Sequence, residues 1–315
     1  MSWMDKISAW LDRFGIKPFA PYEVIFMRVF FAAAVFFLTF PPERELFATQ
    51  PKPNGFAQFI DFTFFADPDV YARFEAIAII CLVLYAAGVL HVVALPYLAW
   101  FSIATKTLAN SQGGISHSYQ MISLILLVQA AVAVAEFGWA LAKGKKVPWF
   151  AGDRWWNSSG IYYSQLAIAG CYVVAAVTKL LDSGGTWLWN SPHLVKELVK
   201  TQRQNFYSTL DPQYAGEVPH VDWLSSHPMV ARLLFSPGLL FELLAFVALL
   251  GRRWALGTGL ALIALHEGIR FFMGLKFTNF EACLTIFFIN VPFWIAAGWK
   301  KLAGGKAKVP EKAAG

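Results

Sequence analysis

Charged residues are scarce in this sequence: they make up 15% of its 315 residues, whereas soluble domains usually carry about a quarter. Apolar residues instead account for 57%, and 29 Phe and 13 Trp are among them. A chain with so many apolar side chains can build a core, which excludes intrinsic disorder. Because it has too few charges to cover a water-soluble surface, the composition indicates a membrane protein.

Cysteine is rare as well. Cys81, Cys171 and Cys283 each lie inside an apolar run, and their spacing matches neither a CxxC pair nor a metal site. We interpret them as small buried hydrophobes and expect no bound metal. The sequence also lacks HExxH, P-loop and GxSxG motifs, which excludes the enzyme classes that depend on those motifs.

Long apolar runs are abundant. A helix needs about 20 mostly apolar residues to cross the hydrocarbon core, and eight segments approach that length: 22–40, 74–91, 93–109, 118–140, 162–181, 236–251, 254–273 and 280–299. They predict an all-α polytopic membrane protein with about eight transmembrane helices in one domain, residues 22–299. The preceding segment, 1–21, lacks the apolar core of a signal peptide and is predicted to be an amphipathic helix on the membrane surface.

Basic residues predict the orientation of these helices. If the N-terminus is inside, Lys and Arg gather in the inner segments, while the short outer loops 110–117 and 274–279 carry only Lys276. This asymmetry is typical of a protein in the cell membrane whose two termini both face the cytoplasm. The basic tail 300–315 then lies inside. The long loop 182–235 lies outside, with an amphipathic helix predicted over 192–204.

Several ionisable residues lie within the predicted spans, where burying a charge is costly. Those close to the inner surface, among them Glu23 and Arg28, we interpret as structural, because snorkelling or mutual pairing explains them. The others come from five helices yet share one depth near the outer surface: His117, Lys179, Glu242, His266, Glu267, Arg270 and Glu281. They predict a shared polar cavity. The alternative is a set of unrelated ion pairs that gather at one depth by chance.

Lys179 is the most informative of these residues because most of the residues before it are apolar. If it faces the bundle, the apolar surroundings and nearby Arg270 would favour its neutral amine, which can accept a proton near neutral pH. His117 and His266 could orient or share that proton. If Lys179 faces lipid instead, its ammonium snorkels to the surface and has no catalytic role.

The order of these polar anchors resembles a known family. Arg28 is followed by SHSYQ (116–120), YSQLAIAGCYVVAAVTKL (163–180), LFSPGLLFELLAFVALLGRR (234–253) and LHEGIRFFMGLKFTNF (265–280). Over residues 22–299 this order is similar to the membrane domain of the vitamin K-dependent gamma-carboxylases. Their wider bacterial relatives are grouped as the horizontally transferred transmembrane (HTTM) family.

In the carboxylases, oxygenation of a reduced vitamin K produces a strong base that removes a proton from a peptide glutamate, and carbon dioxide then adds. The resemblance implies a reduced quinone of the vitamin K type as cofactor, Lys179 as the initiating base, and His117 and His266 as its partners. Two departures argue against transferring the full reaction. Thr178 stands where the carboxylases have a second lysine, and their large lumenal domain has no counterpart in this sequence.

Two functions remain open. The first is a carboxylase-like membrane protein that binds and oxidises a quinol or similar isoprenoid lipid, with Arg270, Tyr119 and Glu242 contributing to ligand binding. The second is a non-catalytic partner or maturation protein that holds a peptide or protein at the outer face. A small transporter is a third possible function, but the absence of an internal repeat argues against it. Nucleic acid is not an expected partner, because the basic residues follow the membrane topology.

Overall fold

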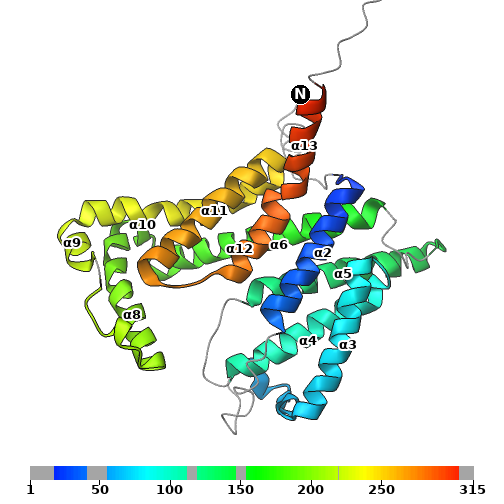
Figure 1. The fold of residues 1–315 in the computed structure, drawn as a ribbon, viewed down its shortest axis with the longest axis horizontal. Helices are drawn as coiled ribbons and strands as arrows, with labels where there is room; N and C mark the ends of the chain where they lie inside the picture. Colours follow the sequence, from blue (N-terminus) through cyan, green and yellow to red (C-terminus); the bar gives the residue numbers. More distant parts are fainter. Residues whose placement is uncertain (1–17, 41–54, 112–118, 147–153, 219, 305–315) are drawn as a thin grey trace, which may run out of the picture.

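The computed structural model describes residues 18–40, 55–111, 119–146, 154–218 and 220–304 (Figure 1). Within these ranges the chain is almost entirely helical and forms no β-strand. The predicted surface helix over 1–21 falls, up to residue 17, outside the described residues, and so does the tail from residue 305. The all-α polytopic membrane fold is confirmed.

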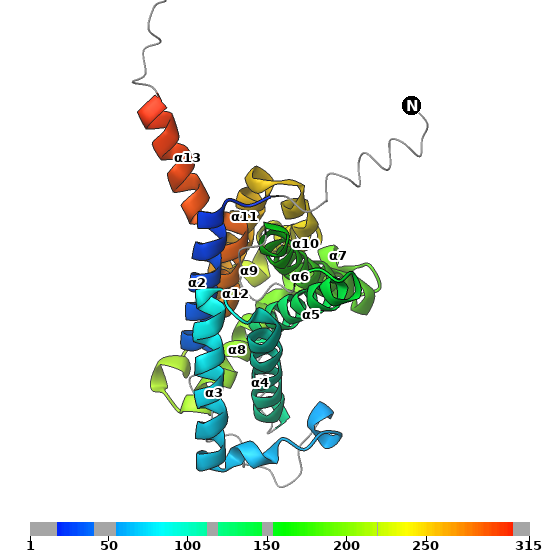
Figure 2. The same ribbon diagram turned by 90° about the vertical axis from the view of Figure 1, so that its right-hand side faces the viewer.

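Seven described helices have the length and apolar composition to cross a membrane. Six of them are α2 (Pro21–Thr39), α3 (Pro68–Ala87), α4 (His91–Ser111), α5 (Gln120–Ala142), α6 (Arg154–Asp182) and α11 (Arg252–Met273). The seventh, Thr278–Leu302, is divided into α12 (Thr278–Leu284), the π-helix η8 (Thr285–Ile289) and α13 (Val291–Gly304). α13 projects beyond the other helices in both ribbon views (Figures 1 and 2).

The predicted span 236–251 is divided in the structure. It falls on α10 (Pro228–Leu243) and the following 3-10 helix η7 (Ala245–Leu250), which ends at Gly251. A 3-10 helix has three residues per turn, so Ala245 and Ala248 lie on one face. Both are buried, because η7 packs tightly against α6 and α11. The predicted span is therefore not one continuous α-helix, and it is not among the seven described helices long and apolar enough to cross a membrane.

Local signals explain where α3 begins and ends. The carboxylate of Asp67 caps its start by accepting hydrogen bonds from the backbone N–H groups of Asp69 (2.8 Å) and Val70 (3.2 Å). The helix ends at Gly88, whose φ of 82° lies in the left-handed region that favours glycine. A Cβ at Gly88 would also lie 2.8 Å from the guanidinium nitrogens of Arg28. The short turn that follows lets α3 and α4 form an antiparallel hairpin.

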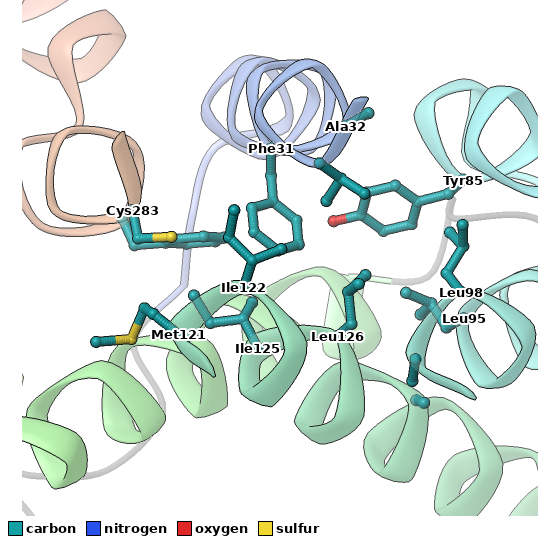
Figure 3. Close-up of a cluster of buried hydrophobic side chains, with 14 of the residues drawn as sticks. Phe31, Ala32, Tyr85, Leu95, Leu98, Met121, Ile122, Ile125, Leu126 and Cys283 are labelled. Atoms are coloured by element: carbon teal, nitrogen blue, oxygen red, sulfur yellow. The ribbon is translucent and has the colours of Figure 1, made fainter. Parts of the chain in front are cut away.

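The main core lies where α2, α3, α4, α5 and η8 meet (Figure 3). Phe31 of α2 is fully buried at its centre. Its ring meets Tyr85 and Phe287 edge-on, with centroids 6.3 Å and 5.3 Å apart, which is a favoured aromatic geometry. Ile122 and Leu126 of α5 close the core from the other side. This packing fixes the central helices and therefore the side chains that they carry toward both ends of the bundle.

The residues between α6 and α10 form a separate layer at one end of the bundle, which we call the loop end. They comprise α7 (Trp187–Asn190), η5 (Ser191–Leu194), α8 (Val195–Thr209), η6 (Pro212–Tyr214) and α9 (Val221–Ser226). Val195, Leu198, Leu224 and Ala231 give this layer a small core of its own. The amphipathic helix predicted over 192–204 is observed as η5 and α8. Two short 3-10 helices, η3 (Gly55–Gln58) and η4 (Thr63–Ala66), precede α3.

Candidate functional site

Lys179 forms an ion pair with Glu242 near the loop end. Lys179 lies three residues before the end of α6, and Glu242 lies at the end of α10. The lysine Nζ donates to both carboxylate oxygens, at 2.7 Å and 2.5 Å. The Lys179 side chain is 39% exposed and the Glu242 side chain 11%. Lys179 therefore points at a neighbouring helix, and in this geometry it is the charged ammonium that the carboxylate stabilises.

His266 of α11 is buried among aromatic rings, with 4% of its surface exposed. Its imidazole stacks on Phe277 with centroids 4.6 Å apart, and Phe280 meets it edge-on at 5.8 Å. On another side, its Nε2 lies 3.3 Å from the hydroxyl of Tyr172. Its Nδ1 is buried and has no hydrogen-bond partner among the described residues. Whichever tautomer is present, one ring nitrogen is available for a polar group that enters the site.

The ion pair and the histidine belong to one polar layer. The helices that carry them pack together, because α10 contacts both α6 and α11, and α11 contacts α12. A carboxylate oxygen of Glu281 is also buried without a partner in the described chain. Helices α6, α10, α11 and α12 thus bring the predicted residues Lys179, Glu242 and His266 to one layer.

Arg270 and Glu267 lie on the exposed side of α11 instead. They form an i, i+3 pair with the Arg270 Nη1 3.1 Å from a Glu267 oxygen, and both side chains are about half exposed. An exposed pair of this kind contributes little to stability. The predicted contribution of Arg270 to ligand binding therefore requires a ligand that reaches this surface.

His117, the third residue of the predicted catalytic set, lies outside the described residues. Its neighbour Tyr119 is described, and the ammonium of Lys106 lies 3.8 Å above the centre of its ring, a cation–π contact. Lys106 belongs to α4 and is only 8% exposed. Sequence reasoning missed this lysine. The signal that could have found it is a charge inside the apolar run 93–109.

Sequence reasoning also missed Tyr172, because a tyrosine in an apolar helix is more often a core residue.

A buried hydrogen-bond chain farther along the bundle was missed as well. There the Tyr85 hydroxyl donates to Gln129 (2.8 Å), whose amide donates to Ser164 (2.9 Å). Every polar atom of such a chain needs a partner in an apolar bundle. These groups satisfy one another and are structural.

At the end of the bundle opposite the loop end, Glu23 is buried but does not pair with Arg28. It accepts from Arg252 (2.9 Å), from the Asn290 amide (2.6 Å) and from the backbone of Ala20 (2.9 Å). Arg28 instead donates to the carbonyl of Ala86 at the end of α3, at 3.1 Å. The mutual pairing of Glu23 and Arg28 considered above is therefore wrong. Arg28 interacts with the carbonyl end of a helix, where a cation is favourable.

Among the described residues, no group of three His, Cys, Asp or Glu side chains is arranged to hold a metal ion. Neither a family model, nor a curated protein, nor a solved structure matches this chain. Interpretation of the site therefore depends on its own geometry.

Proposed function

We propose that this protein binds a reduced quinone or a similar isoprenoid lipid at the polar layer near the loop end, and that it oxidises this ligand as the gamma-carboxylases do. The observation that supports the proposal best is His266. A buried imidazole nitrogen that has no partner among the described residues, enclosed by the rings of Phe277, Phe280 and Tyr172, suits a flat ring that carries a hydroxyl.

Each residue of the proposed site would have a separate role in binding and oxidising the quinol. A bound quinol would supply a hydroxyl proton and the electrons of the oxidation, and dioxygen would accept those electrons, as in the oxygenation that the gamma-carboxylases perform. His266 Nδ1 would bind the hydroxyl, and Tyr172 would hold the imidazole in place through Nε2. Lys179 becomes a base only after its ammonium has lost a proton. Glu242, bonded to Nζ through both oxygens, is positioned to take that proton.

The proposal includes an orientation in the cell membrane with both termini in the cytoplasm. Arg252 reaches the carbonyl of Pro18 (3.1 Å) and Glu23, so the starts of α2 and α11 lie on one side. Exposed basic residues on that side include Arg253 and, at the end of α13, Lys301. This basic side would face the cytoplasm, and the loop end with the quinol site would face outward.

Analysis of the lipids that copurify with the protein tests this proposal. Purified wild-type protein should carry a quinone, measured by mass spectrometry of an organic extract as a ratio of quinone to protein. His266→Ala should lower this ratio several-fold, because it removes the polar partner of the hydroxyl and the imidazole on which Phe277 stacks. His193→Ala is the matched control, since His193 is exposed on η5, and it should leave the ratio unchanged. Phospholipid alone in the wild-type extract would contradict the proposal.

A second candidate function is a non-catalytic partner that holds a peptide or protein on the loop-end layer. It is favoured by the exposure of large aromatic side chains there: Trp189 is 69% exposed, Tyr207 74% and Trp223 52%. Such side chains commonly anchor protein interfaces. Under this alternative, Tyr207→Ala and Trp223→Ala would weaken capture of the partner and leave the quinone content unchanged.

A further inference from the structure

A recess of about 510 Å³, part of it open to the surroundings, lies far from the proposed quinol site. It is lined by residues of α6, η7, the start of α11 and η8, including Tyr162, Gln165, Leu249, Arg252, Phe288 and Asn290. Arg252 and His266 are 14 residues apart on α11, which corresponds to about 21 Å along a helix. The recess is therefore a separate site, at the end of the bundle where α2 and α11 begin.

Two breaks in the membrane helices meet at this recess. The π-helix η8 ends at Asn290, whose φ of 52° is left-handed, and η7 ends at Gly251. Gln165 donates to the carbonyl of Phe287 at 2.7 Å, which satisfies a backbone group that the irregular turn leaves open. Non-helical backbone at membrane depth is tolerated where it is buried in protein or lines a cavity. Here it lines a cavity.

The recess presents hydrogen-bond donors suited to an anion. Nε and Nη2 of Arg252 are bonded to Glu23, but within the described chain no group accepts from its Nη1. Arg252 is also the first residue of α11, and Gly251 before it provides no side-chain cap. The N–H groups of the first turn therefore add a positive field to the guanidinium. A phosphate is a favourable occupant of such a position.

The recess also offers an acceptor. Asn290 is 4% exposed, and its amide nitrogen donates to Glu23. This bond fixes the orientation of the amide, because a carboxylate cannot accept from an oxygen. Asn290 Oδ1 is consequently an acceptor, and it is buried with no partner in the described chain. An occupant that carries a hydroxyl or ammonium donor next to its phosphate would satisfy both Arg252 and Asn290.

We propose that this recess binds a membrane phospholipid whose headgroup joins a phosphate to a hydrogen-bond donor. The phosphate contacts Arg252 and the first turn of α11, the donor reaches Asn290 Oδ1, and an acyl chain follows the apolar wall formed by Leu249, Phe287 and Phe288. Basic pockets between membrane helices are typical sites for lipid headgroups. The proposal goes beyond the quinol site and does not depend on it.

Binding of phosphatidylglycerol to the purified full-length protein, measured by native mass spectrometry, tests this site. The informative variant is Glu23→Gln together with Arg252→Gln. It leaves the net charge unchanged and keeps neutral hydrogen bonds in place of the ion pair. We expect about tenfold weaker binding, because a charge-assisted contact to the phosphate is lost. Lys301→Gln is the matched control: it lowers the net charge at an exposed position near the end of α13 that does not line the recess, and binding should stay within about twofold.

Three further results are informative. Tyr162→Phe removes one hydroxyl from the wall and should weaken binding by a few-fold, which tests the site even if the double variant fails to fold. Phosphatidylcholine, which has the phosphate but no headgroup donor, should bind more weakly than phosphatidylglycerol. An excess of inorganic phosphate should not displace the lipid. Displacement by phosphate, equal binding of the two lipids, or a larger loss in Lys301→Gln than in the double variant would each overturn the proposal.

Discussion

At the scale of single residues, Glu23 and Glu242 keep their charges inside an apolar bundle because each accepts several hydrogen bonds. Glu23 accepts three kinds of donor, and Glu242 accepts two short bonds from Lys179. Pairing of this kind is required because a buried charge without a partner is costly. His266 Nδ1 and a carboxylate oxygen of Glu281 depart from this pattern near the loop end, because both are buried with no partner in the described chain. That contrast separates a candidate ligand contact from the structural ion pairs.

The pairing of Lys179 predicts a specific loss of stability. Lys179→Ala leaves the Glu242 carboxylate, which is 11% exposed, without its counter-ion. We expect the free energy of unfolding to fall by about 1–3 kcal/mol, less than for a fully buried pair because Lys179 is half exposed. Lys179→Met combined with Glu242→Gln should recover most of this loss. Denaturation in detergent followed by tryptophan fluorescence measures both.

Arg270→Ala provides the control for that experiment. It breaks an ion pair of the same chemistry, with Glu267, in which both side chains are about half exposed. The expected change is within about 0.5 kcal/mol. If Lys179→Ala changed the free energy of unfolding as little as Arg270→Ala, the pair of Lys179 with Glu242 would not contribute to stability. Lys179 would then be a snorkelling residue.

Tyr172 has a separate test. Tyr172→Phe removes the hydroxyl that lies 3.3 Å from His266 Nε2 and changes little else. A lost neutral hydrogen bond should cost about 1 kcal/mol of stability, and the copurified quinone should fall because the imidazole is less firmly held. Tyr163→Phe, at an exposed position on the same helix, should change neither quantity. An unchanged quinone content in Tyr172→Phe would show that the Tyr172 hydroxyl does not position the His266 imidazole for ligand binding.

At the scale of elements, two of the predicted spans, 236–251 and 280–299, are interrupted where the chain packs against distant helices. Apolar length is a local property, so α2 to α6 and α11 could be predicted from it. The breaks at η7 and η8 could not, because they depend on packing against α6 and α11. The same reason explains why pairing with Arg28, five residues away, was one of two explanations considered for Glu23, whereas its observed ion-pair partner is Arg252. Lys179 and Glu242 were predicted at one depth from topology alone, but their direct bond required the structure.

The close contact between α11 and η8 predicts different outcomes for two glycines of α11. A Cβ at Gly259 would lie 3.0 Å from the Cβ of Phe288 and 3.2 Å from a side-chain carbon of Ile289. Because neither atom is the end of a flexible side chain, Gly259→Ala should push η8 outward and cost about 1–3 kcal/mol. Gly257→Ala meets no atom within 4 Å and should be neutral or stabilising by up to about 1 kcal/mol. Thermal unfolding of the two variants gives the comparison, and equal stabilities would contradict the close packing of η8.

At the scale of the whole molecule, the two ends of the bundle differ in character. The loop end carries α7 to α9 and the polar layer around His266, whereas the opposite end carries the start of α2, the Arg252 recess and the base of α13 (Figure 1). A membrane protein placed with its basic end in the cytoplasm would offer the first site to the outer leaflet and the second to the inner leaflet. The two proposed lipids would then reach the protein from different leaflets.

This arrangement makes a topology prediction that can be tested with cysteine labelling in intact cells. Tyr207→Cys on α8, where the native side chain is 74% exposed, should react with a membrane-impermeant maleimide from outside. Lys301→Cys on α13 should react only after the membrane is permeabilised, because α13 ends on the opposite side. The wild type is the control, since Cys81 and Cys283 are buried and Cys171 is partly buried in the bundle.

Labelling of both positions in intact cells would place them on one side and remove one crossing. The crossing lost would then be the divided segment formed by α10 and η7, because it is the predicted span that is not among the seven described helices long and apolar enough to cross a membrane. Since Glu242 lies in that segment, the depth assigned to its pair with Lys179 would have to be revised as well.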